Sequence, residues 1–303
     1  MTRTAVVLLV LSAIAHAGWN LASKRQHPTG AFFLVGNTLG GMLLMPLLVY
    51  HWRTLVAFPP QVWGLLAATS AFMAMYYMAL AGAYRSGDLS LAYPLARSLP
   101  APMVVAVSLL VGRADRISGQ CLLGIVLVAA GCLLVPMHRF SEIRLRHYRS
   151  AACLLALLAA VGTAGYSLID DVVLRQLRGQ EDLIRIGVIP LTLMYACLEA
   201  VASSLWLLAV LLPRASGRST LRQVARCQWR VAGLTGAAIF LTYGMVLIAM
   251  AFVRDISYVV AFRQTSILLG TLAGVTFLGE PAHRPKLVGV ASLFVGLLLV
   301  ATG

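Results

Sequence analysis

Long apolar stretches alternate with short polar connections along the whole chain. Ten stretches are poor in charge and approach the roughly 20 residues that an α-helix needs to cross the hydrocarbon core of a membrane. Because backbone polar groups must be satisfied internally in lipid, each stretch is predicted to be helical and each gap to be an interfacial loop. The predicted helices are 5–23, 30–50, 62–84, 89–112, 117–136, 150–169, 186–212, 231–253, 256–279 and 287–303. The pattern predicts an all-α integral membrane protein with ten transmembrane helices.

Two connections are long and basic, 137–149 and 213–230, and the first separates five predicted helices from five. An offset of 166 residues places Arg97 on Arg263 and preserves the order of the segments, which indicates an internal repeat. An odd number of crossings starts the second copy on the opposite side of the membrane, so the repeats are inverted, as in many transporters. The predicted units are a first repeat at 1–136, a basic connecting loop at 137–149 and a second repeat at 150–303.

Composition agrees with a membrane protein and excludes an ordinary soluble domain. The chain is 60% hydrophobic and 11% charged, with a mean hydropathy of +0.87, whereas soluble domains carry roughly 25% charged residues. The formal net charge is +14, but Lys and Arg lie in short connections between apolar stretches. A basic surplus placed there serves membrane topology and anionic lipid headgroups. Membrane lipid is therefore the expected partner, and nucleic acid is not.

Signatures of other chemistries are missing from the sequence. The five cysteines are scattered singly without clustered histidines, so neither a disulfide framework nor a metal site is expected. No glycine-rich phosphate loop and no nucleophile elbow occurs. We predict no cofactor and no enzymatic activity. The stretch 5–23 is interpreted as a retained helix rather than a signal peptide, because it contains polar residues and lacks a convincing cleavage site.

Arg97 and Arg263 are the only charges in the stretches 89–112 and 256–279. A guanidinium stays charged in a protein and is costly at bilayer depth, so two at matched positions suggest a polar cavity on the axis of the repeat. Their predicted role is to bind an anionic group, most naturally a carboxylate, in bidentate geometry. The alternatives are a structural ion pair and a side chain that reaches the interface.

Three acidic residues bear on this hypothesis. Glu199 is the only charge in 186–212, where desolvation would favour its protonated form and make it a candidate proton carrier. The competing interpretation is a salt bridge from Glu199 to Arg97 or Arg263. Asp170 and Asp171 end the predicted sixth helix; Asp170 is assigned to the cavity and is the second candidate for proton coupling, whereas Asp171 is expected to be solvated.

Further polar and aromatic residues lie at helical spacing near these charges. His16, Trp19 and Asn20 share one face of the first predicted helix, and Tyr77 and Tyr243 occupy matched positions in the repeats. The remaining candidates flank the two arginines. The complete set of predicted substrate-binding residues is Arg97, Arg263, His16, Trp19, Asn20, Tyr77, Tyr93, Asp170, Tyr243, Gln264 and Ser266. Asn37 is ambiguous, and paired glycines such as Gly124 and Gly131 are expected to serve close helix packing.

Several strings resemble the EamA-like branch of the drug/metabolite transporter superfamily. They are His16-Ala-Gly-Trp19-Asn20, Arg85-Ser-Gly-Asp88 followed by Tyr93-Pro94 and Arg97, Tyr166-Ser-Leu-Ile-Asp170, and Phe262-Arg263-Gln264-Thr265-Ser266. The resemblance covers essentially the whole chain and implies an exporter of small metabolites in a bacterial inner membrane. Gln264 departs from the acid that is common at this position in the family.

The orientation in the membrane stays open. The resemblance implies cytoplasmic termini, but the gaps place eight Lys and Arg on the side of the termini and fourteen on the other, which favours external termini.

The first hypothesis is a secondary transporter that exports a small carboxylate-bearing metabolite, such as an amino acid or an amino-acid-derived metal chelator, by alternating access. Its substrate would be anionic or zwitterionic, and protons are the candidate coupling ion, with uncoupled exchange as the alternative. Two other hypotheses are a flippase for an anionic lipid-linked headgroup and a non-transporting membrane assembly subunit. A monomer is adequate, and a dimer is compatible.

Overall fold

The computed structural model describes all residues except 24–28, 86–95, 113, 114, 116, 138, 143–149 and 278–280. Across this described part, every regular element is helical. The helices of the first half are α1 (Arg3–Ser23), α2 (Gly30–Met42), α3 (Met45–Tyr50), α4 (Trp52–Val56), α5 (Pro60–Arg85), α7 (Pro100–Leu110), α8 (Gly119–Leu134) and η2 (Phe140–Glu142). Those of the second half are α9 (Ala151–Arg178), α10 (Glu181–Ile184), α11 (Val188–Leu211), α12 (Ala215–Gln223), η4 (Val224–Gln228), α13 (Trp229–Ala249), η5 (Met250–Phe252), α14 (Ile256–Phe262), α15 (Thr265–Phe277) and α16 (Arg284–Thr302).

Five helices of the described chain are long and apolar enough to cross a membrane, which makes this a helical protein with several candidate spans. They are Pro60–Ala83, Ala151–Arg178, Val188–Leu211, Ala215–Phe252 and Arg284–Thr302. The expectation of ten uninterrupted helices of spanning length is therefore wrong. The remaining predicted segments are helical in their described parts. The first, 5–23, lies within the 21-residue α1 (Arg3–Ser23), and the others are shorter or interrupted, as where turn residues 43 and 44 separate α2 from α3.

The basic connection 213–230 also differs from its prediction as a loop. Residues 215–228 form α12 and the π-helix η4, and they continue directly into α13. The segment Ala215–Gln223 contains Leu, Arg and Gln, which are good helix formers. The beginning of the span that contains α13 was therefore predicted too late in the chain, because the prediction used polarity alone.

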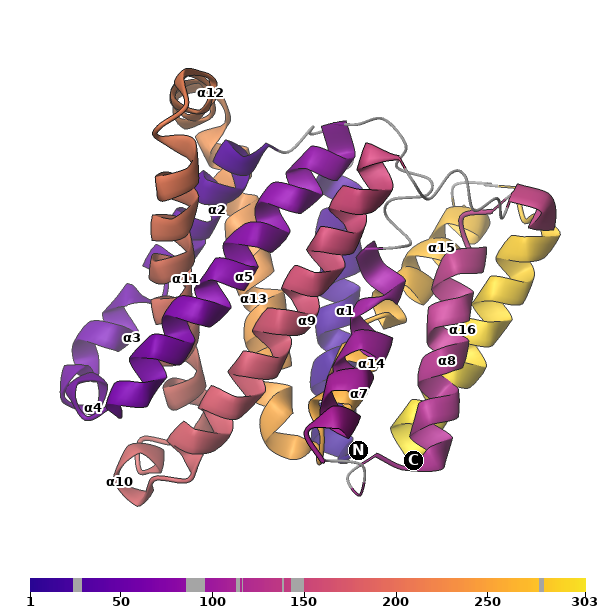
Figure 1. Cartoon of the computed structure of the whole chain (residues 1–303), viewed down its shortest axis with the longest axis horizontal. Coiled ribbons are helices and arrows are strands. Elements are labelled where there is room, and N and C mark those ends of the chain that lie inside the picture. Colours follow the sequence, from indigo (N-terminus) through magenta and orange to yellow (C-terminus); the bar gives the residue numbers. More distant parts are fainter. Residues whose placement is uncertain are drawn as a thin grey trace.

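The helices pack as a bundle in which segments distant in sequence lie side by side (Figure 1). Helix α1 packs on α13 and α15, and α9 packs on α5 and α7. Helix α2 packs on α13, and α11 packs on α5. Three further pairs are in contact: α8 with α16, α2 with α11, and α7 with α14. Small residues permit a close crossing of α8 and α16: a Cβ on Gly124 would lie 2.7 Å from the carbonyl oxygen of Gly296, and one on Gly131 would lie 2.7 Å from that of Gly289. This confirms close approach of α8 and α16 at these glycines.

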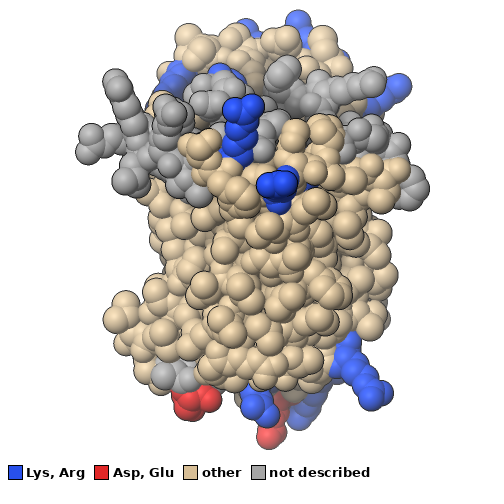
Figure 2. Space-filling model, turned by 90° about the vertical axis from the view of Figure 1, so that its right-hand side faces the viewer, with Lys and Arg blue, Asp and Glu red and all other residues tan. Residues whose placement is uncertain are grey.

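The outer surface suits a bilayer. On the face shown in Figure 2, charged side chains gather toward the two ends, and the described surface between them is mostly uncharged. Large apolar side chains are exposed on the helices in between, for example Leu205 of α11, Leu241 of α13 and Leu298 of α16. Because soluble proteins rarely expose so much contiguous apolar surface, lipid is the expected surrounding.

Candidate functional site

Arg97 and Arg263 both lie where a helix is interrupted. Residues 96–98 are helical, residue 99 forms a bend, and α7 begins at Pro100. Proline lacks a backbone N–H group, and it is tolerated there because the first residue of a helix does not use that group in a hydrogen bond within the helix. In the second half, α14 ends at Phe262 and α15 begins at Thr265, so Arg263 and Gln264 form the turn between them. Interrupted helices at membrane depth are tolerated where they are enclosed by protein or line a polar space.

The structure brings the two arginine segments together. Arg97 Nη2 donates to Ser266 Oγ at 2.9 Å, and Ser266 Oγ donates to the carbonyl oxygen of Arg263 at 3.1 Å. Both arginines also lie within electrostatic range of His16 in α1. Arg97, Arg263 and His16 are all residues of intermediate burial.

Tyrosines surround the Arg263 guanidinium. Its Nη2 donates to the Tyr166 hydroxyl at 3.4 Å, and its central carbon lies 5.7 Å from the centre of the Tyr243 ring, within cation–π range. The Tyr166 ring stands edge-on to Tyr243 at 5.7 Å and to Tyr76 at 6.0 Å. Arg263 Nη1 is buried and makes no hydrogen bond to any described residue. A donor therefore remains available beside an aromatic wall.

Tyr77 extends this wall toward α2. Its ring lies 5.4 Å from that of Tyr76 and stacks on Phe33 at 5.0 Å. Tyr77 is buried and packs between Tyr76 and Phe33, so its role in the aromatic cluster is packing.

Asp170 is fully buried and held by hydroxyl groups from three helices. Thr69 Oγ1 of α5 donates to Oδ1 at 2.7 Å, and the Tyr195 hydroxyl of α11 donates to the same atom at 2.6 Å. The Tyr243 hydroxyl of α13 donates to Oδ2. The predicted end of this helix at residue 169 is wrong, because α9 continues to Arg178. Asp170 consequently lies well inside a helix and deep in the bundle.

Glu199 lies in α11, one helical turn after Tyr195, and is 2% exposed. Its Oε1 is buried and makes no hydrogen bond within the described part of the chain. Ion pairs of the described residues include none from Glu199 to Arg97 or Arg263, so the salt-bridge alternative finds no support. Glu199 does interact electrostatically with Asp170. The bundle thus contains a buried acidic pair in addition to its two arginines.

The other predicted site residues have varied positions. Gln264 is buried, and its Nε2 donates to the Val260 carbonyl at 3.4 Å, while its Oε1 makes no hydrogen bond to a described residue. Tyr93 lies outside the described residues, as do the side chains of Trp19 and Asn20.

Two residues have clear structural partners. Asp171 was expected to be solvated, but it is fully buried, and Arg175 Nε donates to both of its carboxylate oxygens at 2.9 Å. The reason is the longer α9, which keeps Asp171 inside the bundle and places Arg175 one turn away. Asn37 Nδ2 donates to the Ala200 carbonyl, Ser203 Oγ and Ser204 Oγ at 2.9–3.0 Å, and so ties α2 to α11.

Sequence reasoning missed Thr69, Tyr76 and Tyr195. The useful signal was the spacing of Tyr195 and Glu199, which places a hydroxyl and a carboxylate one turn apart on α11. Thr69 carries no such signal, because a single threonine is unremarkable in an apolar helix. Within the described residues, no group of three or more potential metal-ligating side chains comes together.

Comparison with known proteins supports the fold alone. No protein-family model and no curated protein sequence matches the chain. A solved structure described as "Crystal structure of protein" is similar over 99% of this chain and 99% of its own, with a TM-score of 0.65 and 14% sequence identity. The arrangement of helices is thus shared across the whole length with a solved structure, at an identity too low to carry a function.

Proposed function

We propose that the protein is a secondary active transporter of a small carboxylate-bearing metabolite. The observation that carries this proposal is the meeting of two interrupted helices at the centre of the bundle, where Arg97 reaches Ser266, one turn beyond Arg263. Interrupted helices that present charge and helix ends to a substrate recur in transporters. A guanidinium fits a carboxylate with two parallel hydrogen bonds, which makes an organic acid the natural ligand.

The proposed architecture has ten crossings in two inverted five-helix repeats. The remaining helices would cross together with the five long ones. Exchanging α1 with α9, α2 with α11, α5 with α13, α7 with α14 and α15, and α8 with α16 converts the main packing pairs of the fold into observed pairs, and α2 with α11 and α8 with α16 map onto themselves. For example, α1 against α13 becomes α9 against α5. This symmetry of packing supports the repeat and gives two halves that can rock about one site.

The proposed substrate is anionic or zwitterionic. Arg97 and Arg263 would bind its carboxylate, and the rings of Tyr166 and Tyr243 would contact its body. Asp170, whose carboxylate is held by hydroxyl donors, would supply the negative charge for a substrate amine. Glu199 is the proposed proton carrier, because its carboxylate lacks the hydroxyl donors that hold Asp170.

The proposed biological setting follows the sequence resemblance. It places the chain in the EamA-like branch of the drug/metabolite transporters, as an exporter in a bacterial inner membrane. The five long apolar helices are consistent with a multi-pass protein, and a monomer can enclose the proposed site.

The test is thermal stabilisation of the purified protein by a panel of amino acids and other organic acids, with the matching amides as neutral controls. At least one carboxylate should raise the melting temperature of wild type, and Arg97→Gln and Arg263→Gln should abolish that shift. Arg254→Gln, at an exposed position, should retain it. Equal stabilisation of wild type and both site variants would exclude the arginine site.

A further inference from the structure

Five arginines recur at every fourth position where α11 gives way to α13. They are Arg214, Arg218, Arg222, Arg226 and Arg230, and all five are exposed. In an α-helix, a spacing of four residues overshoots one turn by about 40°, so such a series drifts slowly around the helix. The π-helix η4 at Val224–Gln228 has wider turns and therefore reduces this drift. Arg218, Arg222, Arg226 and Arg230 follow one another at about one turn along this helical segment, and Arg214 stands directly before it. The five arginines are called here the basic stripe.

The opposite side of this segment is anchored to the bundle. Val224 is buried, and both α12 and η4 pack on α2. A Cβ on Gly217 would clash with the Leu211 carbonyl oxygen, so α12 sits tightly against the end of α11. The segment is amphipathic and fixed, with its basic stripe turned outward.

The basic stripe has no acidic counterpart nearby. Residues 212–230 include no Asp or Glu, and ion pairs among the described residues involve none of the five arginines. Arg214 and Arg218 donate to backbone carbonyl groups at the end of α11, at 3.2 Å and 2.7 Å respectively. These two arginines partly cap that helix, but their hydrogen bonds are to neutral groups and leave the positive charge uncompensated.

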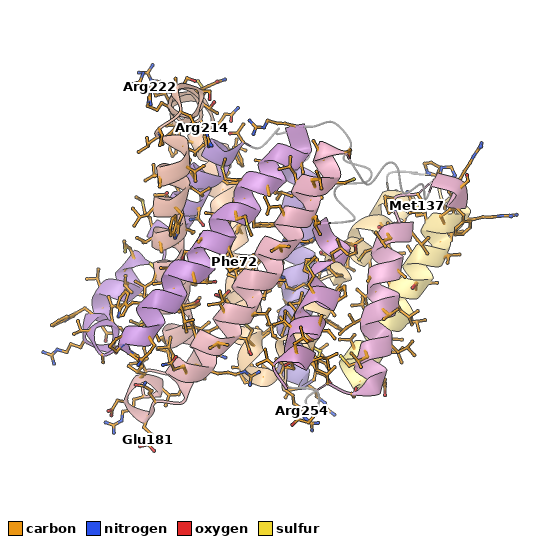
Figure 3. The ribbon with its side chains drawn as sticks, in the orientation of Figure 1. Phe72, Met137, Glu181, Arg214, Arg222 and Arg254 are labelled. Carbon is orange, nitrogen blue, oxygen red and sulfur yellow. The ribbon has the colours of Figure 1, made fainter. Side chains whose placement is uncertain are left out.

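The position of the stripe identifies the class of partner. Arg214 and Arg222 point away from the bundle at the end opposite Glu181 and Arg254 (Figure 3). Exposed apolar side chains follow along the same helical segment: Trp229 is 49% exposed and Leu234 is 74% exposed. The Arg230 guanidinium lies 5.5 Å from the Trp229 ring centre. Tryptophan beside arginine at the edge of an apolar surface is typical of the headgroup layer of a bilayer.

We infer that the basic stripe is a docking surface for the phosphate headgroups of anionic phospholipids in the surrounding bilayer. Guanidinium groups bind phosphate oxygens in bidentate geometry, and several in a row can bind adjacent headgroups. An acidic soluble protein or a nucleic acid would have to approach at the depth where the exposed Trp229 and Leu234 favour contact with lipid. The inference is independent of the proposed transport function.

Cys227 provides the means of testing this inference. It is exposed within η4, whereas Cys121, Cys132, Cys153 and Cys197 are buried. The full-length protein can therefore be labelled there with an environment-sensitive fluorophore and reconstituted in nanodiscs. One series contains phosphatidylcholine alone, and the other contains increasing fractions of phosphatidylglycerol. We expect a blue shift that grows with phosphatidylglycerol and diminishes with added salt, because salt screens exposed charges.

The variant Arg222→Gln/Arg226→Gln spares the two arginines that cap α11 and should at least halve this lipid-dependent shift. The control Arg53→Gln/Arg254→Gln removes two exposed arginines elsewhere and should leave the shift unchanged. The inference is overturned if both lipid series give the same spectrum, or if the control reduces the shift as much as the stripe variant. It is also overturned if a soluble polyanion, such as RNA, produces a larger shift in phosphatidylcholine nanodiscs than phosphatidylglycerol does.

Discussion

Tyr243 connects the acidic and basic parts of the proposed site through a single side chain. Its hydroxyl donates to Asp170, and its ring faces the Arg263 guanidinium. A buried carboxylate is costly unless it is hydrogen-bonded, so the hydroxyls of Thr69, Tyr195 and Tyr243 explain how Asp170 is accommodated. The same contacts hold α5, α11 and α13 around α9.

Replacing Tyr243 with Phe separates these two roles. The ring that faces Arg263 remains, but Asp170 Oδ2 loses its donor, so we expect a loss of about 1–3 kcal/mol in stability. Thermal unfolding of the purified variant measures this loss. Tyr50→Phe, at an exposed tyrosine, is the control and should unfold like wild type. Equal melting temperatures for all three proteins would contradict the proposed role of the hydroxyl.

Glu199 is predicted to couple transport to protons. Burying an ionised carboxylate without a partner is costly, so gain and loss of a proton at Glu199 should change the energy of the closed site strongly. Glu199→Gln should abolish the dependence of substrate flux on a pH gradient while preserving exchange at equal pH. Glu181→Gln, at an exposed position, is the matched control. A pH-gradient dependence unchanged by Glu199→Gln would assign coupling to another group or to none.

At this scale, the sequence identifies charges better than it identifies their partners. Arg97, Arg263 and Glu199 stand out because each is isolated in an apolar stretch. The hydroxyl donors to Asp170 could not be predicted, because Thr69, Tyr195 and Tyr243 come from three helices whose relative rotation is set by packing. Asp171 was predicted to be solvated but is buried, because its burial depends on how far α9 extends.

Among the helices, the interruptions were the hardest features to predict. Pro100 marks the beginning of α7, but the turn between α14 and α15 contains neither proline nor glycine. Its backbone stays hydrogen-bonded through short-range contacts, such as Ile267 N to the Gln264 carbonyl at 2.9 Å. Hydropathy recognises the segment 256–279 as apolar and is insensitive to such a turn. It likewise cannot distinguish a polar loop from the helical α12.

The glycine contact between α8 and α16 gives a prediction about helix packing. A Cβ on Gly131 would lie 2.7 Å from both the Gly289 carbonyl oxygen and Leu293 Cγ. Gly131→Ala should therefore force the helices apart and cost about 1–3 kcal/mol. The matched control is Gly64→Ala in α5, where nothing lies within 4 Å of the added carbon; the gain in helix propensity should keep it at least as stable as wild type. Thermal unfolding in the same detergent compares them, and a Gly131→Ala protein as stable as the control would contradict the tight crossing.

The whole molecule combines a closely packed scaffold with a polar centre. The glycine-lined pair of α8 and α16 joins the two halves, and each half contributes one arginine beside an interrupted helix. The exchange symmetry of the packing pairs relates these contributions. If the halves rock against each other, the arginines stay near the axis while access to them changes from one side to the other.

The repeat stays a prediction at the scale of the whole molecule, and the symmetry of the packing pairs supports it. The shared offset of Arg97 and Arg263 needs only the printed sequence. Their approach through Ser266 needs the fold, because the two arginines are 166 positions apart in the chain. The number of uninterrupted spanning helices was overestimated, because the length of each helix was predicted from apolar composition alone.

The central claim is that the protein itself moves a carboxylate through the site at Arg97 and Arg263. The most direct measurement is counterflow of a radiolabelled carboxylate, chosen by thermal stabilisation, into proteoliposomes that contain only this chain. The account predicts that wild type and Arg254→Gln accumulate the label, and that Arg97→Gln and Arg263→Gln, reconstituted in equal amount, lose at least tenfold in rate, about 1.4 kcal/mol. No flux by wild type, or equal flux by both site variants and wild type, would contradict it.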